Sequence, residues 1–63
     1  MNLVELHSGD VAYCLNADHI IVIRPEPITG GSEITMMGIE QLLFASESYD
    51  EVLQKVRRTN DAN

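Results

Sequence analysis

The sequence predicts an α+β fold that is mainly β, in which a curled antiparallel or small barrel-like sheet of about four to five strands carries one C-terminal helix. Three observations predict this fold. Short runs of alternating apolar and polar residues are separated by clusters of turn-forming residues, which is typical of strands. Residues 20–23 are four β-branched apolar residues in a row. After Ser48 the apolar spacing changes to the period of a helix.

The chain length sets the domain organisation. With 63 residues the chain has room for one domain, which we expect to span residues 1–58, followed by a disordered tail at residues 59–63. So short a chain buries a small core and is marginally stable. Cys14 is the one cysteine, so an internal disulfide is excluded.

The first two strands are expected at residues 3–7 and 11–15. Val4 and Leu6 share one face of the first strand because side chains alternate along a strand. The connection at residues 8–10 contains glycine and other turn formers. These two strands are therefore predicted to form a hairpin.

Residues 19–23 form the most β-like run of the chain. Such a continuous apolar run is typical of a strand covered on both faces, so we expect it at the centre of the sheet, ending near Pro25. One helix can cover one sheet face. The other face then needs a curled sheet, a second subunit or a partner.

Two further strands are expected at residues 32–37 and 41–45. Ile34 and Met36 share one face of the fourth strand, and Leu42 and Phe44 share one face of the fifth. The short glycine-containing connection makes this pair a second predicted hairpin.

The helix is expected at about residues 48–58. Ser48 followed three residues later by Glu51 forms a capping box. Glu51 and Lys55 are spaced for an ion pair on the helix surface. The spacing i, i+3, i+4, i+7 gives one apolar stripe, formed by Tyr49, Val52, Leu53 and Val56. A helix this short needs that stripe docked on the sheet to be stable.

Charge limits the kinds of partner. Ten Asp and Glu residues oppose four Lys and Arg residues, which gives a net charge of −6. Nucleic acid and anionic membranes repel such a surface. We therefore expect a protein partner or a homo-oligomer such as a dimer, with no nucleic acid and no membrane insertion. The N-terminus has no basic segment followed by an apolar run, so we expect no signal peptide and a cytoplasmic location.

Three residues are the soft metal-ligand candidates: His7, Cys14 and His19. Their spacing matches structural zinc sites poorly, so we expect no metal and no cofactor. Cys14 beside a histidine is also the arrangement of a nucleophile, but a chain this short has little room for a pocket of about 300 Å³ or more. We expect no catalytic residue and no enzyme activity. A small metal or ligand binder using these three residues remains an alternative.

Three apolar residues lie in or beside predicted turns: Ile28, Met37 and Ile39. Exposed together, they would form a contact patch for a partner. The alternative is that Ile28 and Ile39 tuck under the ends of the sheet.

Four segments carry a family resemblance: Leu6-His7-Ser8-Gly9-Asp10, Leu15-Asn16-Ala17-Asp18-His19-Ile20, Ile34-Thr35-Met36 with Gly38, and Glu47-Ser48-Tyr49-Asp50-Glu51-Val52. In length and order the chain resembles the FlbD-type family of small flagellar and swarming-motility proteins. The resemblance implies a non-catalytic, motility-associated accessory protein and no catalytic residues. The alternative is a phage-encoded or operon-encoded assembly factor unrelated to motility.

Overall fold

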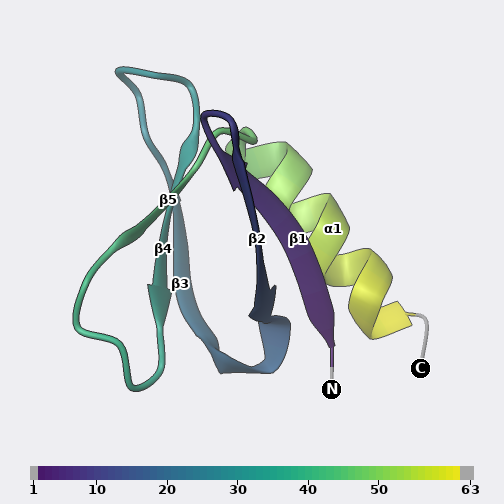
Figure 1. Cartoon of the computed structure of the whole chain (residues 1–63). Helices are drawn as coiled ribbons and strands as arrows, with labels where there is room; N and C mark the ends of the chain where they lie inside the picture. Colours follow the sequence, from purple (N-terminus) through teal and green to yellow (C-terminus); the bar gives the residue numbers. More distant parts are fainter. Residues whose placement is uncertain (1, 62–63) are drawn as a thin grey trace.

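The computed structural model of the chain describes residues 2–61, and the side chains of residues 2–59. It confirms the predicted fold, with five strands and one C-terminal helix (Figure 1). The elements are β1 Leu3–Ser8, β2 Val11–Asn16, the 3₁₀ helix η1 Ala17–His19, β3 Ile20–Pro25, β4 Ser32–Met36, β5 Leu43–Ala45 and α1 Tyr49–Asp61. None of the helices within residues 2–61 is long and apolar enough to cross a membrane.

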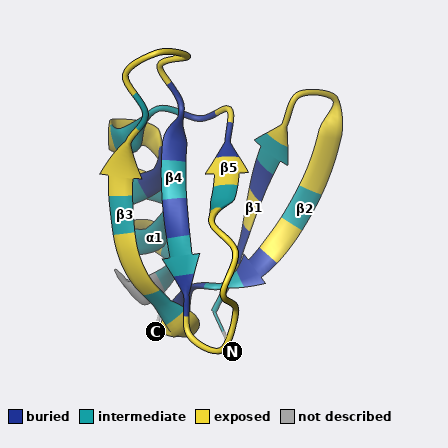
Figure 2. Ribbon diagram, turned by 90° about the vertical axis from the view of Figure 1, so that its left-hand side faces the viewer, coloured by how far each residue is buried: buried dark blue, intermediate teal, exposed yellow. Residues whose placement is uncertain are grey.

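The strands form two antiparallel sheets, β1-β2 and β3-β4-β5. Both predicted hairpins, β1–β2 and β4–β5, are present. In the first of them Gly9 has φ 62°, a conformation that glycine adopts without steric cost. The strands stand in the order β3, β4, β5, β1, β2, with α1 behind them (Figure 2), and β1 contacts β5. The sheets curl together without closing into a barrel.

The core lies between the curled strands and α1. Leu6 of β1, Ile34 of β4 and Val52 of α1 are each fully buried, so the three elements share one apolar centre. Burying one such side chain stabilises the fold by about 1.5–3 kcal/mol. The other buried apolar residues are Val4, Leu15, Ala17, Met36 and Ala45.

The prediction that residues 19–23 form the central strand is wrong. β3 is an edge strand, and within residues 2–61 it pairs with β4, which is the central strand of its sheet. A bulge between Ile20 and Val22 lets Ile20 and Ile23 both pack against the core while Ile21 and Val22 stay exposed. The β-branched run reflects β propensity, which does not report how many layers cover a strand.

The fifth strand begins at Leu43, two residues later than predicted. The strand is short, and its register places Leu43 opposite Ile34 and Ala45 opposite Ser32, on the inner side of the sheet. Phe44 therefore points away from the core and is exposed. Leu42 precedes the strand and is also exposed.

The helix begins as predicted. The Glu51 N–H donates to Ser48 Oγ at 3.3 Å, and the Ser48 N–H donates to Glu51 Oε1 at 3.4 Å, which completes the capping box. The helix continues to Asp61, three residues beyond the expected end. Of the tail expected at residues 59–63, residues 59–61 are thus helical, and residues 62–63 lie outside the described residues.

Candidate interaction surface

One side of the β3-β4-β5 sheet faces away from the core. The register places Arg24, Glu33 and Phe44 in one row across the three strands, and Val22 opposite Thr35 in another. The intervening row of Ile23, Ile34 and Leu43 points inward. We call the solvent side the outer face; it comprises Ile21, Val22, Arg24, Glu33, Thr35 and Phe44.

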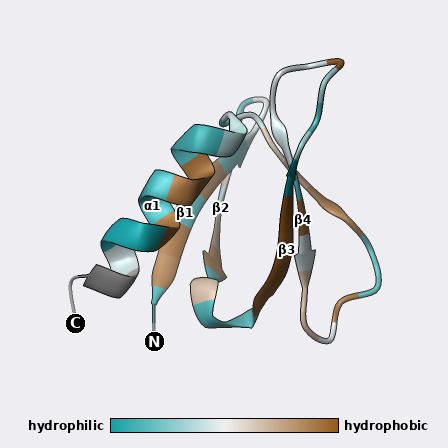
Figure 3. Cartoon of the chain, turned by 180° about the vertical axis from the view of Figure 1, so that it is seen from behind, coloured by the Kyte–Doolittle hydropathy of each residue, from teal (hydrophilic) through white to brown (hydrophobic). Residues whose placement is uncertain are grey.

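The outer face exposes large apolar side chains. Ile21, Val22 and Phe44 are 59%, 41% and 53% exposed. Figure 3 shows β3 as the most continuous hydrophobic segment, lying at the edge of its sheet. Scattered apolar residues are ordinary on protein surfaces, but apolar residues gathered on one sheet face mark an interaction site.

The charges on the outer face cancel. Arg24 and Glu33 are its charged residues, and Arg24 Nη2 lies 3.2 Å from Glu33 Oε1. An exposed pair of this kind adds little stability. It does leave a neutral face on a chain whose net charge is −6.

The three residues predicted as a contact patch do not form one patch. Ile28, Met37 and Ile39 are all exposed, at 91%, 61% and 46%, so neither Ile28 nor Ile39 tucks under the sheet. Ile28 lies in the β3–β4 connection, whereas Met37 and Ile39 lie in the β4–β5 connection at the other end of β4. Sequence reasoning missed Val22 and Phe44, because their exposure depends on the bulge in β3 and on the register of β5.

The β3–β4 connection is held in shape by Glu26. Its carboxylate accepts hydrogen bonds from Thr29 Oγ1 at 2.6 Å, the Thr29 N–H at 2.7 Å and the Ile28 N–H at 3.1 Å. These hydrogen bonds lower the pKa of Glu26, and the bond from the Thr29 hydroxyl has the largest effect. These bonds hold the backbone of the loop at Ile28 and Thr29.

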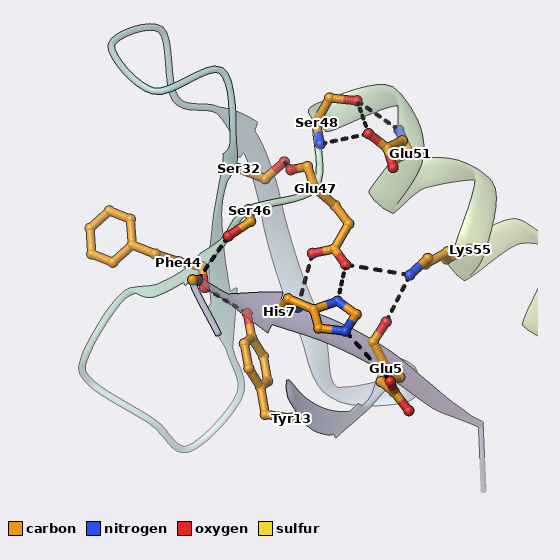
Figure 4. A network of polar contacts seen from close by, with 11 residues as sticks. Glu5, His7, Tyr13, Ser32, Phe44, Ser46, Glu47, Ser48, Glu51 and Lys55 are labelled. Carbon is orange, nitrogen blue, oxygen red and sulfur yellow. Dashed lines mark hydrogen bonds and ion pairs between the residues drawn. The ribbon is translucent and has the colours of Figure 1, made fainter. Parts of the chain in front are cut away.

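A polar network centred on Glu47 joins β1 to α1 (Figure 4). The His7 N–H donates to Glu47 Oε1 at 2.9 Å, and His7 Nδ1 lies 2.6 Å from Oε2. Lys55 Nζ lies 3.5 Å from Oε2 and donates to the Glu5 carbonyl at 3.0 Å. Lys55 thus reaches across to Glu47 and Glu5, and the ion pair predicted between Lys55 and Glu51 is replaced by these contacts.

Glu47 is ionised at neutral pH. Its burial would by itself raise its pKa, but hydrogen bonds from the His7 side chain and N–H, together with the charge of Lys55, lower that pKa to about 2. Because an ionised carboxylate only accepts hydrogen bonds, His7 Nδ1 carries the proton. A carboxylate of such low pKa is a weak base, so this network is suited to holding elements together.

Tyr13 ties the hairpin to the second sheet. Its hydroxyl donates to the Phe44 carbonyl at 2.7 Å. Burial of the Tyr13 side chain raises its pKa, and the negative charge of Glu47 raises it further by a smaller amount. The bond fixes the backbone of β5, and so the outward direction of the Phe44 side chain.

The candidate metal ligands are not brought together. His7 is engaged by Glu47, Cys14 is exposed on β2 opposite Glu5, and His19 lies at the other end of the hairpin, after β2. Across residues 2–59, no three His, Cys, Asp or Glu side chains gather as a metal site would require. The metal-binding alternative therefore lacks a geometric basis in this part of the chain.

The surface has two hollows that are larger than we expected for a chain of this length. One hollow of about 370 Å³ lies between β1 and the C-terminal half of α1, lined in part by Leu3, Lys55 and Arg58. Another, of about 340 Å³, lies beside the β3–β4 connection and is lined in part by Glu26 and Phe44. Both exceed the size of about 300 Å³ that the length argument disfavoured, although both are open to solvent.

Comparisons with known protein families, with characterised proteins and with solved structures find no match for this chain.

Proposed function

We propose that this chain is a non-catalytic protein-interaction module that binds its partner through the outer face. The observation that carries the proposal is the exposure of Ile21, Val22 and Phe44 on one sheet face whose two charges cancel. Each Å² of apolar surface that a partner removes from water contributes about 25 cal/mol. An apolar, neutral surface favours a folded protein as the partner over nucleic acid or an anionic membrane.

The polar side chains support a binding role. The buried carboxylate of Glu47 is occupied by His7 and Lys55, and the hydroxyl of Ser32 donates to the Glu47 carbonyl at 2.9 Å. Every buried side-chain nitrogen or oxygen among the described residues has a hydrogen-bond partner. Groups engaged in this way stabilise a scaffold that presents its surface rigidly.

The biological setting that we propose is that of a cytoplasmic, motility-associated accessory protein, on the strength of the resemblance to the FlbD-type family. The alternative is a phage-encoded or operon-encoded assembly factor. A strain that lacks the gene should swim or swarm poorly if the motility role is right. Normal swimming and swarming would exclude that role while leaving the interaction module untouched.

The binding role is tested by affinity capture with matched variants. Val22→Glu places a charge among the exposed apolar residues of the outer face, whereas Val11→Glu makes the same change on β2, where Val11 is 64% exposed. We expect the protein retained by the wild type to be lost with Val22→Glu and kept with Val11→Glu. Equal retention by both variants would contradict binding through the outer face.

A further inference from the structure

The outer face has the properties of a surface that binds a copy of itself. We infer that its occupant is a second copy of this chain, in a two-fold symmetric dimer; the inference rests on the proposed function. A two-fold interface brings one patch against itself, so the patch must be self-complementary. The outer face meets this condition because it carries one cation and one anion on neighbouring strands, Arg24 on β3 and Glu33 on β4.

The charge distribution favours a second copy over a partner of opposite charge. Arg24 and Glu33 contribute nothing to the net charge, so the whole charge of −6 lies elsewhere on the chain. A basic partner would be attracted to those acidic surfaces rather than to the outer face. Two copies of an acidic protein repel each other least where their surfaces are neutral, and the outer face is such a surface.

The register defines an arrangement of the two copies. Arg24 stands opposite Glu33, and Val22 stands opposite Thr35, on adjacent strands. The outer faces of the two copies lie against each other, and the two-fold axis runs between them, parallel to the strands and midway between β3 and β4. This axis sets Arg24 of each copy over Glu33 of the other. The same axis sets Val22 over Thr35. Arg24 is available for this contact because its side chain is 61% exposed.

The same axis places Phe44 of each copy beside the open edge of β3 of the other copy. β5 lies on the far side of β4 from β3, so after the two-fold rotation it extends past the open edge of β3 of the second copy. Phe44 then covers that edge, where the backbone of β3 is paired on one side. Covering an unpaired apolar edge protects it from uncontrolled pairing with other chains.

The size of the face sets the strength of the dimer. Three strands about 4.8 Å apart and about five residues long make a face of about 14 by 16 Å. A face of this size covers about 220 Å² on each copy, or about 450 Å² on the two together, which is well below the total of about 1,200 Å² that stable specific interfaces bury. We therefore expect a weak, reversible dimer whose population depends on concentration.

Sedimentation analysis of the full chain tests the inference. Between about 1 µM and 1 mM, the wild type should shift from 7.0 kDa to twice that mass. Val22→Glu should stay monomeric throughout, and Val11→Glu should follow the wild type, with circular dichroism checking that both variants are folded. A wild type that stays at 7.0 kDa over the whole range would overturn the dimer. The capture experiment would still decide whether the outer face binds a different protein.

Mixing two charge variants tests the arrangement itself. Arg24→Glu gives the face two acidic residues and Glu33→Arg gives it two basic residues, so each variant should be monomeric alone. An equimolar mixture should dimerise at least about tenfold more tightly than either variant, because every contact across the axis is again between opposite charges. Mixing cannot repair an ion pair lost within one chain. A mixture that stays monomeric while the wild type dimerises would therefore overturn the proposed face-to-face contact.

Discussion

Glu47 is a residue whose side chain links separate segments of this small fold. It is 9% exposed, and its carboxylate bonds to His7, forty positions earlier in the sequence. Its charge is held in place by Lys55 from α1. Because Glu47 lies between β5 and α1, one side chain joins the first strand, the last connection and the helix.

Replacing Glu47 with Gln should therefore destabilise the protein at neutral pH. The change leaves the bonds of His7 and Lys55 weakened or unpaired, and such a loss costs about 1–3 kcal/mol. The measurement is the free energy of unfolding in urea. Glu40→Gln serves as the control because Glu40 is exposed, and it should change that free energy by less than about 0.5 kcal/mol.

The same carboxylate should control stability in acid. The pKa of Glu47 falls from 4.5 to about 2 on folding, so its contribution is fully present above pH 4.5 and is lost as the pH falls toward 2. The wild type should lose stability over this window, and Glu47→Gln should lose less. Parallel pH profiles for the two proteins would contradict this role.

Gly31 is fixed by a close backbone approach. A Cβ atom at this position would overlap the carbonyl oxygen of Ala45, which is main chain and cannot rotate away. Gly31→Ala should cost about 1–3 kcal/mol, measured by urea unfolding. Gly38→Ala, where φ is +80° and the space is open, should cost about 1 kcal/mol from backbone strain. A smaller cost at Gly31 than at Gly38 would contradict the close approach.

At the scale of the elements, local features could be predicted from the sequence and non-local features could not. The start of α1 follows from Ser48 and Glu51, which are three residues apart. The edge position of β3 depends on which strands pair with it, and its period-2 pattern is broken by the bulge near Ile21. The Glu47 network likewise joins residues forty positions apart, and no sequence pattern identifies that pairing.

The position of β3 can be measured by native-state hydrogen exchange. Amides of β4 should exchange most slowly in this sheet because β4 pairs on both sides. Amides of β3 that point away from β4 should exchange much faster than those of β4 even at high protein concentration, because a face-to-face dimer covers that backbone edge with Phe44 but does not pair it. Protection of these amides that rises to the level of β4 at high concentration would indicate edge-to-edge pairing instead.

At the scale of the whole molecule, residues 2–61 provide one α-helix to cover a curled arrangement of five strands. The helix packs on the concave side, where Val52 meets Leu6 and Ile34 in the core. No second α-helix within residues 2–61 covers the opposite side, so Ile21, Val22 and Phe44 remain in water. That something beyond the helix covers one face of residues 20–23 stays a prediction.

The most direct test of the outer face is a dilution series of amide NMR spectra of the wild type. Between about 1 mM and about 10 µM, we expect the signals of Val22, Thr35 and Phe44 to shift with the monomer–dimer equilibrium, while the signals of Val11 and Cys14 on β2 stay in place. Shifts confined to β2, or the absence of any shift on the outer face with and without a captured partner, would contradict the claim that this face is the interaction surface.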